Sequence, residues 1–264
     1  MNFYTPMALL LLVIGCLCLL AAIPQMVKSI EKTLTKAEMP LPSRKVLFSG
    51  IAVQNLFMLM IAAAIGTLLA PAADLQAPVL KAILTGGSVW QGIKPQLLPG
   101  VVAGLVSALA FIPAYYTFFL QHLDFQTLWA VENHRLNLNL VGRLLYNGIF
   151  EEIIVRWGLM TLFVWLGSLF SGEISALIVW LAIFISGAAL ALLYLPDYYA
   201  AGCLKSRPFF AFIAFLYIWN AAVFGWLFWQ YGFEAAIIAH MIFLLIWYLY
   251  DMRLNIAKKI EALN

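Results

Sequence analysis

Two adjacent glutamates and an arginine interrupt a long apolar run near the middle of the chain. Within residues 141–169, Glu151 is followed at once by Glu152, and Arg156 comes four positions after the second glutamate. A charge at the centre of a membrane helix costs about 2.5–3.5 kcal/mol even on the lenient insertion scale. Such groups therefore face a bundle interior or a water-filled cavity, where they pair or do chemistry.

The spacing of these charges predicts different roles for the two glutamates. Glu152 and Arg156 are four apart with the glutamate first, so we expect a structural ion pair on one helix face. Glu151 points about 100° away around the helix and has no local cation. Its carboxylate is a candidate general base, and Asn147, one turn earlier, is placed to hydrogen-bond it. The alternative is a purely structural polar cluster that locks this helix to its neighbours, but that hypothesis does not explain the second glutamate.

A single histidine stands deep in the last apolar run. His240 is about ten residues from the inner end of its run and Glu151 about ten from the start of its own, so at about 1.5 Å per residue they reach a similar depth. Two roles are open for His240, a hydrogen bond between helices or a catalytic group. His122 and His134 fall in a polar connector, where we expect them to be solvated.

The composition indicates that these residues belong to a membrane protein. Of 264 residues, 65% are apolar and 10% are charged, and the mean hydropathy is +0.97. A soluble domain is about half apolar and a quarter charged, and a globule of this size could not cover so much apolar surface. We expect an integral, multi-pass protein of the cell membrane, or of the inner membrane if bacterial. This excludes a secreted disulfide scaffold, a nucleic-acid binder and an ordinary cytosolic enzyme.

Seven apolar segments exceed the ~17 residues needed to cross the hydrocarbon core, which predicts an all-α membrane bundle of about seven helices. We divide the chain into N-terminal transmembrane helices with a basic inner loop (1–120), an amphipathic connector (121–140), the helices that carry the polar motifs (141–250) and a cytosolic tail (251–264). The segment 77–91 is too polar to span. The expected spans are Pro6–Val27, Val46–Leu69, Leu98–Leu120, Val141–Leu169, Ile174–Leu195, Pro208–Trp229 and Phe233–Tyr250.

Lysine and arginine are divided unevenly between the two sets of loops. With the N-terminus outside and the C-terminus inside, twelve basic residues fall on the inner side and two on the outer, as the positive-inside rule requires. In this orientation Cys203 is expected to be accessible from the basic side. The outer pair is Lys81 and Lys94, and the inner set is Lys28, Lys32, Lys36, Arg44, Lys45, Arg135, Arg143, Lys205, Arg207, Arg253, Lys258 and Lys259.

The polar residues of the second half resemble the motifs of a known family. The pattern Glu-Glu-x-x-x-Arg, here within Phe150-Glu-Glu-Ile-Ile-Val-Arg-Trp-Gly158, is similar to the first motif of the CPBP (CAAX protease and bacteriocin-processing, or Abi) intramembrane endopeptidases. The run from Gly225 to His240 resembles the closing motif and its lead-in. The likeness covers roughly residues 140–250, and it implies a membrane bundle with a peptide-hydrolysing site.

Two motifs depart from the family pattern. The second motif is Phe-x-x-x-His, where this chain has Leu190 and Tyr194, and the third is His-x-x-x-Asn/Asp, where it has Leu244 in last place. The resemblance implies that the first glutamate, here Glu151, activates water with the second-motif histidine. It also implies that the third-motif histidine, here His240, stabilises the oxyanion together with the Asn. A metal-assisted version of this reaction has been proposed in the family.

The residues that remain are compatible with catalysis at an altered site. Glu151 is a candidate base, and His240 a candidate oxyanion donor. The Tyr194 hydroxyl is a second candidate donor, and we expect it near the inner face, just before Pro196 ends its helix. Leu244 can donate nothing. No cofactor is expected, and a metal is poorly supported, because one histidine and one or two glutamates fall short of the usual zinc ligands.

Three hypotheses for the function follow. The first is an intramembrane endopeptidase with an altered site, which cuts a peptide, a prenylated tail or a membrane protein near the inner face. The second is a catalytically inactive relative that keeps the fold to bind a peptide, a lipid or a partner membrane protein. The third, a proton-coupled transporter with Glu151 as the relay, has less support because the sequence contains no visible repeat or pair of broken helices. Each places the chain in a lipid bilayer without a nucleic-acid partner.

Overall fold

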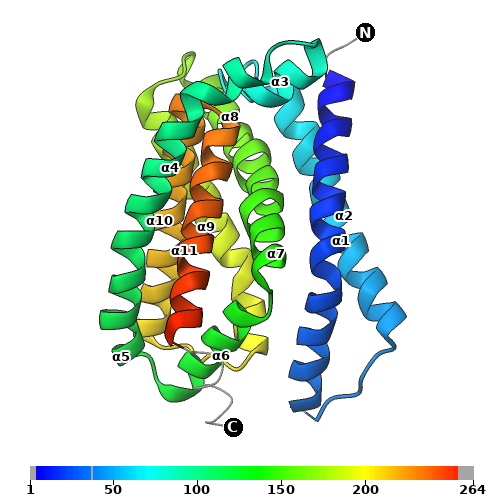
Figure 1. Cartoon of the computed structure of the whole chain (residues 1–264), viewed down its shortest axis with the longest axis vertical. Coiled ribbons are helices and arrows are strands. Elements are labelled where there is room, and N and C mark those ends of the chain that lie inside the picture. Colours follow the sequence, from blue (N-terminus) through cyan, green and yellow to red (C-terminus); the bar gives the residue numbers. More distant parts are fainter. Residues whose placement is uncertain (1–3, 37, 255–264) are drawn as a thin grey trace.

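The computed structural model describes residues 4–36 and 38–254, and within these ranges the chain is helical without strands (Figure 1). Seven helices of this described part are long and apolar enough to cross a membrane, which confirms the predicted all-α bundle. The spans in chain order are α1 (Tyr4–Lys36); α2 (Arg44–Leu69); α4 (Val89–Ala114), continued by η1 (Tyr115–Phe119) and α5 (Leu120–His122); α7 (Leu140–Gly142), η2 (Arg143–Phe150), η3 (Ile153–Met160) and α8 (Thr161–Ser171) in one span; α9 (Ala176–Ala200); α10 (Arg207–Tyr231); and α11 (Phe233–Leu254).

Two further helices lie at opposite ends of the bundle (Figure 1). α3 (Pro78–Thr85) lies at the end where α1 begins, in the segment that is too polar to span. α6 (Phe125–Leu136) lies at the end where α11 finishes, within the predicted connector. Asp124 caps α6 by accepting a hydrogen bond from the backbone N–H of Thr127 at 2.8 Å, as an N-cap aspartate does. The connector is therefore an ordered helix across one end of the bundle.

The fifth span continues past the predicted stop at Pro196. α9 runs on to Ala200, and the chain turns at Gly202, whose φ is +103°. A proline removes one N–H donor, but membrane helices tolerate the loss because neighbouring groups satisfy the freed carbonyl. The prediction that Pro196 ends this helix was therefore wrong, and Tyr194 lies within α9 rather than at its end.

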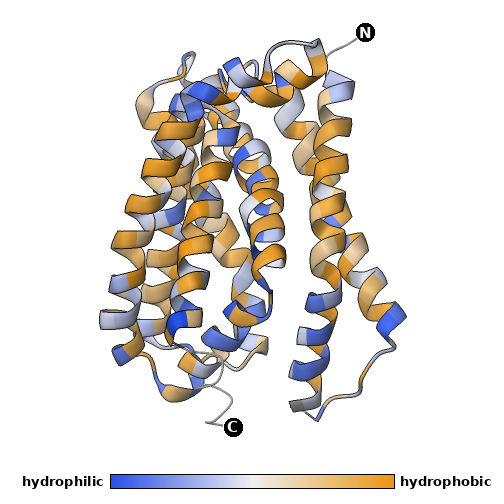
Figure 2. Ribbon diagram, viewed as in Figure 1, coloured by the Kyte–Doolittle hydropathy of each residue, from blue (hydrophilic) through white to orange (hydrophobic). Residues whose placement is uncertain are grey.

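Apolar residues make up most of the length of the spans, and hydrophilic residues gather mainly toward the two ends of the bundle (Figure 2). Among the outward-facing side chains, Leu109 is 71% exposed and Val53 is 67% exposed. Exposed apolar surface of this extent is stable in lipid and not in water. This distribution fits a multi-pass integral membrane protein.

Small residues allow α11 to pack closely against α4. A Cβ built on Gly104 would lie only 2.7 Å from the carbonyl oxygen of Ala239, and one built on Gly100 would lie 3.0 Å from that of Ala235. Close backbone approach through small residues is the usual packing of membrane helices. Because Ala239 is held in this contact, the next residue, His240, has a fixed position in the bundle.

The loop after α9 is packed rather than open. Cys203 is 6% exposed, and its Sγ lies 3.9 Å from the carbonyl oxygen of Thr127 in α6. The backbone N–H of Leu204 donates to Thr127 Oγ1 at 2.9 Å. Burial, with a smaller contribution from nearby Asp124, raises the pKa of the Cys203 thiol to about 12. The expectation that Cys203 is accessible was therefore wrong, because α6 covers the loop.

The direction in which the bundle crosses the membrane stays a prediction. α1 begins at the α3 end and α11 finishes at the α6 end, as an odd number of spans requires (Figure 1). Residues 255–264 of the predicted tail, including Lys258 and Lys259, lie outside the described residues.

Candidate active site

The span that carries both glutamates is wound more widely than an α-helix. η2 and η3 are π-helical and lie on either side of Glu151 and Glu152. In a π-helix each backbone bond reaches five residues along the chain, and such turns are frequent at functional sites. Close packing fixes this span against α2, because a Cβ on Gly66 would lie 2.2 Å from the carbonyl oxygen of Trp157. This close contact holds the span that carries the two glutamates against α2.

Glu152 is fully buried and has two partners. Its Oε2 lies 3.3 Å from Nε of Arg156, so the predicted ion pair is present. Its Oε1 accepts a hydrogen bond from Nδ1 of His240 at 2.7 Å. Arg156 also donates from Nη2 to the carbonyl oxygen of Asn220 in α10 at 2.8 Å. This carboxylate thus joins side chains from two spans, and Arg156 reaches a third.

His240 reaches the predicted depth but contacts Glu152 rather than Glu151. Its ring stacks on Phe224 of α10 with the centroids 4.5 Å apart. Because an ionised carboxylate only accepts hydrogen bonds, Nδ1 is the donor to Glu152. The other ring nitrogen, Nε2, is left for a different contact.

Glu151 has a separate partner on α9. The Tyr194 hydroxyl donates a hydrogen bond to Glu151 Oε1. Asn147 makes no side-chain hydrogen bond to Glu151 in the described structure, although the spacing had suggested one. The reason is the winding of η2, since bonds that reach five residues bring Asn147 one turn below Glu152 instead.

One cavity of about 1050 Å³ connects these groups. It lies between α1 and α2 on one side and α6, η2, α9, α10 and α11 on the other. Glu151, Tyr194, His240 and Asn147 all line it, together with Leu244. Ligand pockets commonly measure roughly 300–1,000 Å³, so this cavity has room for a peptide segment with an apolar attachment.

His134 is a cavity residue that sequence reasoning missed. α6 brings its ring to 4.7 Å from that of Tyr198 and 6.3 Å from that of Tyr194, measured between centroids. It is half-buried in the wall of the cavity, whereas His122 is exposed as expected. Burial lowers the pKa of His134, and the carboxylate of Asp197 opposes that shift. No motif marked His134, because its neighbours come from a helix more than fifty residues later.

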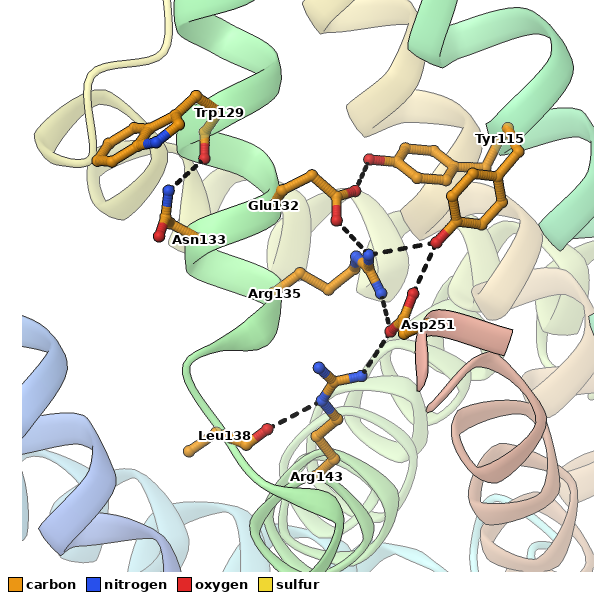
Figure 3. Close-up of polar contacts among 9 residues, drawn as sticks. Tyr115, Trp129, Glu132, Asn133, Arg135, Leu138, Arg143 and Asp251 are labelled. Carbon is orange, nitrogen blue, oxygen red and sulfur yellow. Dashed lines mark hydrogen bonds and ion pairs between the residues drawn. The ribbon is translucent and has the colours of Figure 1, made fainter. Parts of the chain in front are cut away.

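A second polar cluster, the α6 network, fastens α6 to the ends of three spans (Figure 3). Arg135 forms ion pairs with Glu132 of its own helix and with Asp251 of α11. Nη1 of Arg143, at the start of η2, lies 3.1 Å from Oδ2 of Asp251. The tyrosine hydroxyls of the third span donate to the two carboxylates. The α6 network consists of Tyr115, Tyr116, Glu132, Arg135, Arg143 and Asp251.

The side chains around Glu151 fit a zinc ion poorly. A catalytic zinc site uses three protein ligands, and no group of three or more His, Cys, Asp or Glu side chains in the described ranges is arranged to hold a metal. Glu152 is taken up by Arg156 and His240, and Glu151 accepts from Tyr194. A metal-assisted reaction would require these contacts to be exchanged for metal bonds.

Comparison with known proteins gives one match. Residues 133–246 match the family model described as type II CAAX prenyl endopeptidase, Rce1-like. No curated protein and no solved structure matches the chain. The matched segment begins in α6 and includes both glutamates, Tyr194 and His240.

Proposed function

We propose that this chain hydrolyses a peptide bond within or near the membrane, with Glu151 activating the attacking water. The match of residues 133–246 to the Rce1-like family model of type II CAAX prenyl endopeptidases supports this proposal, as does the resemblance to the CPBP endopeptidases. One observation carries this proposal. Of the two adjacent glutamates, Glu151 lines the cavity and Glu152 does not.

The two glutamates have different roles in this proposal. Glu152 is buried and holds Arg156 and His240, so its charge is balanced and its oxygens are directed at protein groups. Glu151 faces the cavity and accepts only from Tyr194, which leaves its second oxygen for a water molecule. A carboxylate within hydrogen-bond reach of water takes a proton as the water oxygen attacks a carbonyl carbon. Glu151 is therefore the base, and Glu152 positions His240.

The tetrahedral oxygen needs hydrogen-bond donors from the cavity wall. His240 uses Nδ1 to hold Glu152, so in the protonated ring Nε2–H is free to donate to the oxyanion. Pre-aimed donors of this kind are worth about 10²–10³ in rate each. The Tyr194 hydroxyl holds the carboxylate in place before water enters. Its single proton can turn to the oxyanion once Glu151 has taken a proton from the water.

The rest of the cavity suits a substrate that is part peptide and part lipid. Apolar side chains of α1, α2 and α9 line it, among them Met26, Ile30, Met58 and Leu193. Polar side chains near α6 line the same space, including Asn133. A prenylated or otherwise membrane-bound peptide would place its apolar part against the first group and its backbone near Glu151.

A second candidate function is favoured by Leu244, which lines the cavity where the family pattern has a polar residue. An apolar side chain there removes one hydrogen-bond donor from the site. A non-catalytic relative that binds a peptide or lipidated tail in the same cavity would keep the shape without needing that donor. The two functions differ in whether bound peptide is cut.

The test is cleavage in reconstituted membranes. Purified wild-type protein, Glu151→Gln and the control Glu173→Gln are placed in liposomes with farnesylated and unmodified peptides that end in a CAAX sequence. Glu173 is exposed in the loop between α8 and α9. We expect mass spectrometry to detect cleavage by wild type and the control, and loss of cleavage by about 10²-fold or more in Glu151→Gln.

Other outcomes are equally informative. Peptide binding without cleavage by wild type would favour the non-catalytic relative. Undiminished cleavage by Glu151→Gln would show that Glu151 is not the base.

A further inference from the structure

His134 has an open imidazole in the same cavity as Glu151. Neither of its ring nitrogens hydrogen-bonds a described residue, and neither is sealed away from the cavity. Its ring meets the edge of the Tyr194 ring, and Tyr194 donates to Glu151. Asp197, one turn after Tyr194 in α9, is the carboxylate whose charge acts on His134. An imidazole with a nearby carboxylate, directed into a reaction cavity, has the arrangement of an acid–base group.

The α6 network holds this imidazole in place. The residues on either side of His134 are both engaged, since Asn133 donates to the backbone of Trp129 and accepts from Lys32, and Arg135 pairs with two carboxylates. Figure 3 shows Arg135 and Glu132 directed toward the third span and α11. With this face of α6 fixed, the neighbouring position His134 is turned toward α9.

Peptide hydrolysis requires a proton at a second place. When Glu151 takes a proton from water, the water oxygen bonds to the carbonyl carbon. Before the carbon–nitrogen bond breaks, the departing nitrogen must gain a proton, because an amide ion is a poor leaving group. Glu151 lies beside the attacking water, on the Tyr194 side of the cavity, so a second group is needed to carry the proton onward.

We propose that His134 is a catalytic residue that receives this proton from Glu151 through the Tyr194 hydroxyl or a cavity water, and delivers it to the departing nitrogen. This role rests on the proposed function. The proton balance closes, since water supplies one proton to Glu151, His134 passes it on, the carbon–nitrogen bond breaks, and both side chains return to their starting states. Asp197 stabilises the imidazolium that forms in between.

The electrostatic surroundings agree with a proton carrier that starts neutral. Burial lowers the pKa of His134 from its ordinary value, which keeps the resting ring unprotonated and able to accept. The Asp197 carboxylate acts in the opposite direction and limits that shift. The titratable groups nearest to His134 are on α9, namely the rings of Tyr194 and Tyr198 and the Asp197 carboxylate. Other titratable or charged side chains that line the same cavity are Lys32, Arg135, Arg143, Glu151, Tyr146, Tyr217, Arg156 and His240.

The first experiment compares two leaving groups. His134→Gln and the control His122→Gln are assayed on a peptide and on the matching ester, in which oxygen replaces the departing nitrogen. An alkoxide leaves more readily than an amide ion, so an ester depends less on the proton that His134 delivers. We expect His134→Gln to lose about 10²-fold or more on the peptide and to stay close to wild type on the ester. Glu151→Gln should lose activity on both the peptide and the ester.

The second experiment uses pH. His134 must be unprotonated to accept, so kcat/KM for the peptide falls as pH drops through its pKa. Asp197→Asn removes the carboxylate that raises this pKa, and should move the acid limb of the profile to lower pH. Glu151 must also be unprotonated to act as the base, so the acid limb has two contributions, and His134→Gln should remove only the one that Asp197→Asn shifts.

Two results would overturn the role of His134. These are equal losses on peptide and ester in a folded His134→Gln protein, or an unshifted acid limb in Asp197→Asn. Absence of peptide and ester cleavage by wild type would instead reject the proposed function, and the role of His134 with it.

Discussion

The two polar clusters of this bundle use similar side chains in different ways. In the α6 network, Arg135 and Arg143 share Asp251, and two tyrosine hydroxyls complete the contacts of the carboxylates, which do not line the cavity. Around Glu151, the carboxylate has one hydroxyl partner and lines the cavity. In the α6 network each carboxylate therefore has a cation and a hydroxyl as partners, whereas Glu151 has one hydroxyl partner and faces the cavity.

This difference distinguishes a structural cluster from a catalytic one. A buried charge with several partners is costly to disturb, because any single loss leaves an uncompensated ion. A carboxylate with one neutral partner can change its proton or its contacts at lower cost. Substitutions in the α6 network should therefore act on folding, and those at Glu151 and Tyr194 on turnover.

The largest effect on folding is expected from Asp251→Ala. It leaves two buried guanidiniums without their shared carboxylate, and loss of one partner of a buried ion pair costs about 3–5 kcal/mol. The yield of folded protein in detergent, measured by size-exclusion chromatography, should drop sharply. The control Glu31→Ala breaks the exposed pair with Arg44, whose side chain is 81% exposed, and should leave the yield near wild type. A full yield from Asp251→Ala would remove the distinction between the clusters.

Within the candidate site, Arg156→Ala should disturb folding next most. Glu152 would keep only His240 as a partner in a fully buried position, so the expected cost is toward the lower end of about 3–5 kcal/mol. Glu151→Gln keeps the size and removes a charge that has no cation partner, so its yield should stay near wild type. Thermal melting of both variants in detergent checks this order. Equal losses in the two would mean that both glutamates are structural.

A smaller effect, on turnover alone, is expected from Tyr194→Phe. The change removes only the hydroxyl that donates to Glu151, so kcat should fall by about 10²-fold while KM changes little. Melting temperature and steady-state kinetics on the same preparation separate the two roles. An unchanged kcat would indicate that Tyr194 is only a wall of the cavity.

The least disturbing experiment asks which side of the membrane the α6 end faces. Lys205→Cys and Glu173→Cys place thiols at exposed loops near opposite ends of the bundle, and neither should alter folding or turnover. An impermeant maleimide should label Lys205→Cys only from the cytoplasmic side and Glu173→Cys only from the other. The native Cys203 should stay unlabelled near neutral pH, because it is buried and its thiol pKa is about 12. Reversed labelling would overturn the predicted orientation.

Sequence patterns predicted most of the spans and part of the site. Apolar length alone located the seven helices, because nothing shorter satisfies its backbone in lipid. The spacing of Glu152 and Arg156 predicted their contact for the same local reason. By contrast, the hydrogen bond between His240 and Glu152 depends on how α11 packs against the fourth span. The sequence did not predict the α6 network or the position of His134. The interacting residues in both cases come from segments far apart in the chain, and no local periodicity relates them.

The π-helical turns beside the two glutamates affect how this span tolerates the deletion of a residue. A helix whose bonds reach five residues holds more residues in each turn than an α-helix, so η2 contains spare length. Deleting one residue there could rewind the turn as α-helix while both ends of the span stay in place. Because the lost residue is taken up inside η2, Glu151 and Glu152, which follow η2, would keep their directions toward α9 and α11. In a span that is α-helical throughout, the same deletion would turn every later side chain by about 100° relative to the neighbouring helices.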